Sequence, residues 1–195
     1  MLATTPNLQT LITATGALHK HLCPRQILGV RMGVLAGELL GIDFPQTDKR
    51  VIAFVETDGC FADGVMVVTG CSLGHRTMRL VDVGKVAVTM ADTKTGRAVR
   101  LWPTPQSRSL AGQYAPQARN RWQAQLEAYQ VMPVRELLRA DEVKLQISLE
   151  ALVGKRGIRV NCESCGEEIL NGRERLLDHR TLCVHCAGER YWSPV

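Results

Sequence analysis

Four cysteines near the C-terminal end of the chain constrain its fold more than any other feature. Cys162 and Cys165 form one Cys-x-x-Cys motif, and seventeen residues separate it from a second motif, Cys183 and Cys186. Each motif turns two sulfur atoms toward one ion, and the intervening residues let the second motif fold back over the first, as in four-cysteine zinc sites. A rubredoxin-like iron site fits the same sulfur ligands. We predict a small zinc ribbon over residues 158–195.

The remainder of the chain has the composition of a globular domain. Its 195 residues, 45% of them hydrophobic, suffice for one medium-sized domain followed by the ribbon. No apolar run approaches the roughly 18 uncharged residues of a membrane-spanning helix, and the N-terminal residues lack a signal-peptide pattern. Seven cysteines, four of them with metal-type spacing, fit a reducing compartment. We expect a cytoplasmic protein without membrane contact, with a core domain over 1–153.

Hydrophobic periodicity outlines the elements of this core. Helices are predicted over 6–19, 24–40 and 62–71, a polar helical region over 106–138, and strands at 51–56, 79–83, 85–89, 98–102 and 143–149. Gly29, Gly33 and Gly37 recur every four residues along one face of the second helix. The stripe indicates either close backbone packing, against another helix or a partner subunit, or a tolerated run of small residues.

Basic residues concentrate in one part of the core. Between residues 94 and 139, eight lysines and arginines outnumber two glutamates. Beside aromatic residues such as Trp122, these cations are able to contact phosphates and let bases stack, which is typical of nucleic-acid binding. A solvated, arginine-rich helical face explains the same composition.

The remaining cysteines suggest a second metal site. His19, His21 and Cys23 alternate along a short segment, so their side chains converge if that segment is extended. Cys23 precedes Pro24 at the start of a predicted helix, where the helix dipole stabilises a thiolate. Cys60 follows an Asp-Gly pair at the start of another helix and has the same advantage.

These four residues, which we call the inner site, allow two kinds of metal chemistry. A closed tetrahedral set of two histidines and two cysteines is structural, whereas three protein ligands and a water permit water activation or Lewis-acid chemistry. The alternative is that the histidines are surface or capping residues and the cysteines small buried hydrophobes. That alternative suits Cys71, on an apolar helix, and a favourable first-turn charge explains Asp63.

Several motifs in the same order resemble the FmdE family, which comprises the E-type subunits of formylmethanofuran dehydrogenase. They are His19-Lys-His-Leu-Cys-Pro24 with the glycine-striped helix, Glu56-Thr-Asp-Gly-Cys-Phe-Ala-Asp-Gly64, Thr69-Gly-Cys-Ser-Leu-Gly74 and Asp82-Val-Gly-Lys-Val-Ala-Val88. The resemblance covers roughly residues 10–103. The C-terminal ribbon resembles the zinc finger of TraR/DksA-type proteins.

The resemblance implies an α+β core with N-terminal helices on a mainly antiparallel sheet, commonly dimeric with exchanged elements. It implies a second metal, expected to be zinc, at the inner site, with Asp63, Thr69 and Cys71 nearby. The family motif has glycines where this chain has Lys20 and Arg25. These two cations favour a small anionic ligand, so Lys20, Arg25 and Asp63 are predicted to bind it.

The resemblance also implies a function, namely a zinc-binding accessory protein or subunit linked to molybdenum or tungsten oxidoreductases of the formylmethanofuran or formate dehydrogenase type. Its expected partners are a second copy of the chain and such an oxidoreductase. One alternative is an autonomous metal-dependent enzyme that uses the inner site. A second is a nucleic-acid-binding or regulatory protein that acts through the ribbon and the basic segment.

Overall fold

A computed structural model describes residues 6–19, 21–154, 157–193 and 195 of the chain. The chain divides into two compact units, Met1–Gln146, the core unit, and Ile147–Val195, the ribbon unit. Every helix among the described residues is too short or too polar to cross a lipid bilayer.

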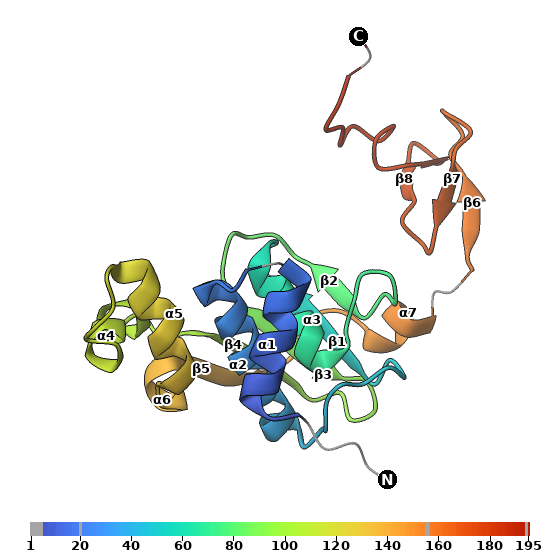
Figure 1. Ribbon diagram of the computed structural model, residues 1–195. Helices are drawn as coiled ribbons and strands as arrows, with labels where there is room; N and C mark the ends of the chain where they lie inside the picture. The colour runs from blue at the N-terminus through green and yellow to red at the C-terminus, as the bar shows by residue number, and fades with distance from the viewer. Residues whose placement is uncertain (1–5, 20, 155–156, 194) are drawn as a thin grey trace. The chain divides into compact units, whose positions relative to one another are not determined.

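Three helices form one layer of the core unit (Figure 1): α1 Leu8–His19, α2 Pro24–Leu40 and α3 Cys60–Thr69. The predicted bounds of α2 are confirmed, because Pro24 favours the first helical turn and Gly41, at φ 67°, ends the helix in the left-handed conformation. By contrast, α3 begins at Cys60 rather than at residue 62. It ends at Thr69 because Gly70, at φ 74°, caps it.

A five-stranded sheet forms the second layer, in the order β2-β1-β3-β4-β5. Its strands are β1 Val51–Val55, β2 Met78–Leu80, β3 Val88–Asp92, β4 Ala98–Pro103 and β5 Leu138–Val143. Only β1 and β2 are parallel, so the α+β fold with a mainly antiparallel sheet is confirmed. The strand predicted at 143–149 is wrong, because β4 begins at Ala98 opposite Val143 and offers no partner to later residues.

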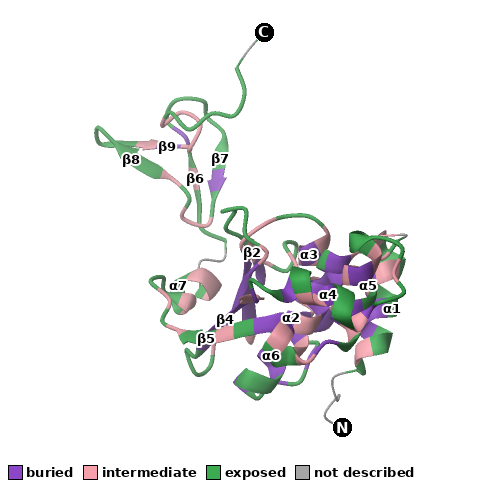
Figure 2. Ribbon diagram, turned by 90° about the vertical axis from the view of Figure 1, so that its left-hand side faces the viewer, coloured by how far each residue is buried: buried purple, intermediate pink, exposed green. Residues whose placement is uncertain are grey.

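The core lies between the sheet and the helical layer. All residues of β1 and β3 are buried, and α2 contacts β3 and β4 while α3 contacts β1 (Figure 2). The predicted strand at 85–89 starts late, at Val88, because the preceding loop follows the end of β1 instead. Within that loop, the backbone N–H groups of Val83 and Lys85 both donate to the carbonyl of Glu56, each at 3.1 Å.

Three further helices extend this layer: α4 Ser107–Tyr114, α5 Arg121–Val131 and α6 Val134–Leu137. Arg31 of α2 joins α5 to the core by donating to the carbonyls of Tyr129, Gln130 and Met132 at 2.9, 3.2 and 2.8 Å. A cation at these carbonyls also complements the negative end of the α5 dipole.

The ribbon unit consists of α7 Leu149–Gly154 followed by two hairpins. One hairpin pairs β6 Arg159–Asn161 with β7 Glu168–Leu170, and the other pairs β8 Arg175–Leu177 with β9 Arg180–Leu182. Among its described residues, the buried hydrophobic side chains are Cys162, Ile169 and Leu182. So small a core requires another source of stability, which a bound metal ion supplies in modules of this size.

Candidate functional site

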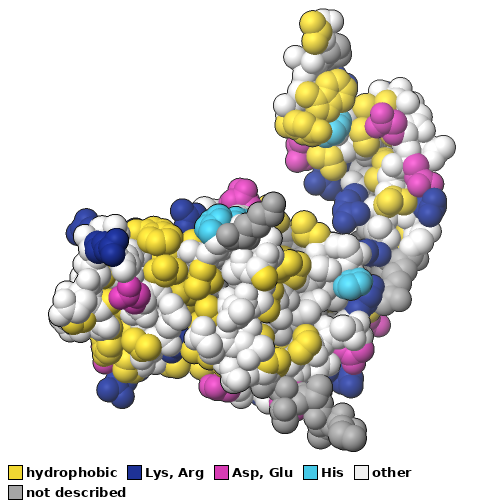
Figure 3. All heavy atoms as spheres, in the orientation of Figure 1, with side chains coloured by type: hydrophobic (Ala, Val, Ile, Leu, Met, Phe, Trp, Pro, Cys, Tyr) yellow, Lys and Arg dark blue, Asp and Glu magenta, His cyan; other side chains and the backbone are white. Residues whose placement is uncertain are grey.

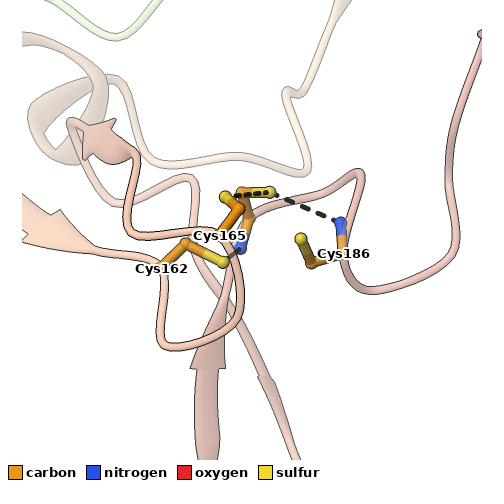
Figure 4. A group of neighbouring side chains, drawn as sticks. Cys162, Cys165 and Cys186 are labelled. Atoms are coloured by element: carbon orange, nitrogen blue, oxygen red, sulfur yellow. Dashed lines mark hydrogen bonds between the residues drawn. The ribbon is translucent and has the colours of Figure 1, made fainter. Parts of the chain in front are cut away.

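The four cysteines of the ribbon converge on one point. Their sulfur atoms all lie within 4.8 Å of one another, and Figure 4 shows them at neighbouring turns of the chain. Cys165 Sγ and Cys183 Sγ are 3.9 Å apart, and the backbone N–H of Cys183 donates to Cys162 Sγ at 3.2 Å. The two motifs therefore face each other as a four-sulfur metal site requires.

The electrostatics of this cluster favour a cation. Backbone N–H donors of Cys165 and Cys183 lower the pKa of Cys162 to about 6, so its thiolate forms readily. The pKa of Cys165 rises to about 12 even though the Glu167 backbone favours its thiolate, because burial and the neighbouring sulfurs oppose a second negative charge. A divalent cation removes this opposition by compensating all four thiolates.

The inner site also brings predicted ligands together. One ligand atom from each of His19, His21 and Cys60 lies within 4.8 Å of the other two. His19 Nε2 is 3.6 Å from Cys60 Sγ, and the two imidazole rings meet edge to face with centroids 4.7 Å apart. His21 is exposed whereas the other two are half-buried, so the site is accessible from one side. In Figure 3 histidine side chains (cyan) reach the surface of the core unit beside acidic side chains (magenta).

Close packing of α2 against α3 creates this arrangement. A Cβ atom added to Gly64 would lie 2.9 Å from the backbone nitrogen of Val30 and would overlap the carbonyl of Gln26, and one added to Gly29 would overlap the carbonyl of Phe61. The predicted glycine stripe therefore serves close packing, against α3 of the same chain. Because the two helices touch near their first turns, the positive ends of both dipoles face the cysteines that begin them.

Asp63 has a role that sequence reasoning did not assign. Its Oδ2 lies 2.8 Å from His19 Nδ1, one helical turn beyond Cys60. When Nδ1 donates its proton to this carboxylate, the lone pair of Nε2 faces the Cys60 sulfur. Carboxylates orient metal-binding histidines in this way, fixing the tautomer and raising the basicity of the ligand nitrogen.

Cys23 lies beside this cluster but outside the group of three mutually close ligand atoms. Gln26 fixes the backbone of Cys23, because its side-chain oxygen accepts the Cys23 N–H at 2.7 Å. The amide nitrogen of the same buried side chain reaches the carbonyl of Thr15 in α1, at 3.3 Å. Sequence reasoning missed Gln26, although a residue able to cap a helix start three positions after Cys23 was the available signal.

The charge state of Cys60 is balanced between opposing influences. Burial raises its pKa most, and a hydrogen bond and negative charge from Cys23 raise it further. Its own backbone and the guanidinium of Arg25 act in the opposite direction. A cation among these side chains would favour the thiolate, so Cys60, like the ribbon cysteines, is better suited to holding a metal than to remaining empty.

Other predicted residues fall at varied positions. Lys20 lies outside the described residues, whereas Arg25 is exposed in the first turn of α2. Thr69 and Cys71 are buried and directed to the backbone: Thr69 Oγ1 donates to the carbonyl of Val65 at 2.7 Å, and Cys71 Sγ lies 3.5 Å from that of Val51.

The basic segment between residues 94 and 139 is partly neutralised. Arg100 makes two short hydrogen bonds to Glu56, at 2.6 and 2.7 Å, and Arg97 lies 3.3 Å from Glu142. These pairs remove two of the free positive charges that the composition suggested for nucleic-acid binding.

Comparisons with known proteins match both units. Residues 18–139 match the family described as FmdE, molybdenum formylmethanofuran dehydrogenase operon, and residues 154–191 match the prokaryotic dksA/traR C4-type zinc finger. The two resemblances noted from the motifs are thereby confirmed. The second match also supports zinc as the metal of the four ribbon cysteines.

Two individual proteins are similar over nearly the whole chain. An FmdE-like protein of tungsten formylmethanofuran dehydrogenase from Syntrophus aciditrophicus shares the fold, with a TM-score of 0.62 and 21% identity over 98% of this chain and 100% of that one. A probable S-adenosyl-L-methionine-binding protein of Archaeoglobus fulgidus is 29% identical over 202 residues, which cover 94% of this chain. Because these residues are 54% of that protein, this chain spans about half the length of its curated relative.

Proposed function

Because the chain belongs to the FmdE family and carries a C4-type zinc finger, we propose that it is a zinc-binding accessory protein or subunit of a molybdenum or tungsten oxidoreductase. The description of the family and the name of the structurally similar protein support a partner of the formylmethanofuran or formate dehydrogenase type. In this proposal the core unit holds a second metal ion, and the ribbon is a structural module.

One observation carries the metal-binding part of the proposal: His19 lies between Cys60 on one side and Asp63 on the other. A histidine held at both nitrogens, by a thiol at 3.6 Å and a carboxylate at 2.8 Å, has the orientation and tautomer of a metal ligand. His21 and Cys60 supply the next two ligands, and Cys23 is the nearest candidate for a fourth. Imidazole and thiolate ligands suit zinc.

Metal analysis of single variants tests this assignment. The wild-type protein is expected to contain two zinc ions per chain, and Cys60→Ser and Cys162→Ser are each expected to contain one. A double variant lacking both cysteines should contain none. Two ions retained in Cys60→Ser, with unchanged resistance to a chelator, would refute the inner site.

The partner is tested separately, by affinity purification of the tagged chain from its own organism. We expect a protein containing molybdenum or tungsten to copurify with the wild type, and metal analysis of the eluate to detect that element. Its absence from eluates, with both zinc ions bound, would leave the metal sites standing and remove the oxidoreductase partner.

A second copy of the chain is the other proposed partner. The edge of the sheet at β2 supports it, since Leu73, Leu80, Val81 and Val83 in and beside this strand are exposed hydrophobic residues. Light scattering coupled to gel filtration should give twice the chain mass for the wild type and the chain mass for Val83→Glu. A monomeric wild type would contradict the proposal.

An autonomous metal-dependent enzyme is the second candidate, and the ligand count favours keeping it. Three donor atoms gather closely at the inner site without Cys23, and a cavity of about 220 Å³ lined by His19 and Asp63 adjoins them. Three protein ligands with one open position are typical of catalytic zinc. Cobalt substitution distinguishes the two, because Cys23→Ser alters the thiolate-to-cobalt absorption only if Cys23 is the fourth ligand.

A further inference from the structure

A second cavity of the core unit, of about 500 Å³, has a lining that no part of the proposed metal chemistry uses. The first turn of α2, the loop before β3, the end of β4 and helices α4 and α5 all contribute to it. Its volume is within the range of small-molecule sites in proteins. Pro24 and Arg25, the residues after Cys23, form part of its wall, so it begins next to the inner site.

The lining of this cavity is positively charged. Arg25, Lys85, Arg100 and Arg108 contribute to it, and no aspartate or glutamate among the described residues does. Glu56 neutralises Arg100 from outside the cavity, through hydrogen bonds of 2.6 and 2.7 Å. Among the described residues, the other three cations form no ion pair, so about three positive charges face one enclosed volume without compensation. Such a volume attracts anions.

The remaining wall is apolar and flat. Trp102 is half-buried, with the guanidinium of Arg100 5.0 Å from the centre of its ring, and Tyr129 is 2% exposed. Leu28 and Val86 complete this surface. An inorganic anion would leave it uncovered, whereas a ligand with a ring or a short apolar body would bury it.

The cavity is also held in shape before any ligand binds. The carbonyl of Glu56 accepts the backbone N–H groups of Val83 and Lys85, and its own N–H donates to the carbonyl of Ala87 at 3.0 Å. The carboxylate of the same residue holds Arg100. One residue of the core unit thus fixes both the loop that carries Lys85 and the strand that carries Trp102, which lowers the entropic cost of binding.

We propose that this cavity binds a small organic anion, with its carboxylate or phosphate among Arg25, Lys85 and Arg108 and its apolar body against Trp102 and Tyr129. The inference deepens the proposed function and rests on it in one respect, since it assigns a ligand class to the surroundings of the inner site.

A matched pair of fluorescent probes tests the charge preference. 8-Anilinonaphthalene-1-sulfonate and N-phenyl-1-naphthylamine share an aromatic body, and only the first carries a negative charge. We expect the anion to bind once per chain and at least about tenfold more tightly than the neutral probe. Displacement by phenyl phosphate or by benzoate then shows which anionic group the site prefers.

Charge removal at the cavity supplies the site-specific test. Lys85→Gln and Arg108→Gln should each weaken the anionic probe about five- to tenfold, and both together more strongly. The control is Arg139→Gln, an exposed arginine of β5 that does not line the cavity, and thermal unfolding verifies that each variant folds. Equal binding of the two probes, or binding unaffected in both cavity variants, would overturn the proposal.

Zinc content measured on the same samples separates this inference from the metal proposal. Two zinc ions without selective anion binding would refute the cavity ligand and leave the inner site standing. Selective anion binding with only the ribbon zinc would do the reverse.

Discussion

Replacement of Gly64 by alanine tests how far the inner site depends on helix packing. The added Cβ would lie 2.9 Å from the Val30 nitrogen and closer still to the Gln26 carbonyl, whereas ordinary contacts start at 3.4 Å. The helices must therefore separate by at least 0.5 Å, the difference between 3.4 and 2.9 Å. Metal–ligand distances tolerate only about 0.2 Å, so we expect a loss of at least about tenfold in metal affinity at Cys60.

The same change also affects stability. Overfilling a well-packed contact costs about 1–3 kcal/mol, and the gain in helix propensity from alanine offsets up to about 1 kcal/mol of this. Thermal unfolding of the core unit should therefore occur at a lower temperature, with folding retained. The decisive assay is zinc analysis after mild chelation, which should show two ions in the wild type and only the ribbon zinc in Gly64→Ala.

Gly112→Ala is the matched control. Gly112 also lies within a helix, α4, but a Cβ atom there would have open space within 4 Å. We expect it to keep both metal ions and to be as stable as the wild type or slightly more so. If Gly64→Ala retains both ions with wild-type affinity, the contact between α2 and α3 does not set the ligand spacing.

Three further predictions concern single residues. Asp63→Asn should weaken zinc at the inner site by about tenfold, as seen by competition with a chelator, because His19 loses its orienting carboxylate; Asp58→Asn, an exposed neighbour, should not. The lowered pKa of Cys162 means that its thiolate stabilises the folded ribbon fully above the ordinary thiol value of 9.0 and ceases to do so as the pH falls through about 6. Calorimetry should therefore show zinc binding to release about one more proton at pH 5 than at pH 7, and an unchanged count would contradict the shift. Arg31→Met should lower the free energy of unfolding by about 2–4 kcal/mol in urea titrations, because three carbonyls at the end of α5 lose a charged donor; no change would mean that α5 is held by its apolar contacts alone.

Local signals made much of this molecule predictable. The ribbon cysteines were recognisable because ligand spacing within a motif is a property of consecutive residues. The bounds of α2 were equally local, since Pro24 and Gly41 determine where a helix starts and stops. The inner ligands were a stronger inference, because they required Cys60 to approach the segment that ends at Cys23.

The features that were missed depend on contacts between distant segments. Whether Asp63 faces solvent or His19 is decided by the rotation of α3 against the end of α1, which no spacing records. The strand predicted at 143–149 alternated correctly, yet pairing with β4 selected Leu138–Val143 instead. The anion cavity unites residues from Pro24 to Tyr129, and its charge emerges only when Glu56 is seen to neutralise Arg100 alone.

The order of segments along the chain separates two properties of the core unit. Every residue assigned to the inner site precedes Gly64, whereas much of the cavity wall belongs to β4, α4 and α5, between residues 98 and 131. Substitutions in the later segment can therefore alter which molecule is held while the earlier segment keeps its metal. A chain built in this way is able to acquire new ligand preferences by local change, and exchange of α4–α5 between relatives is a practical route to retargeting it.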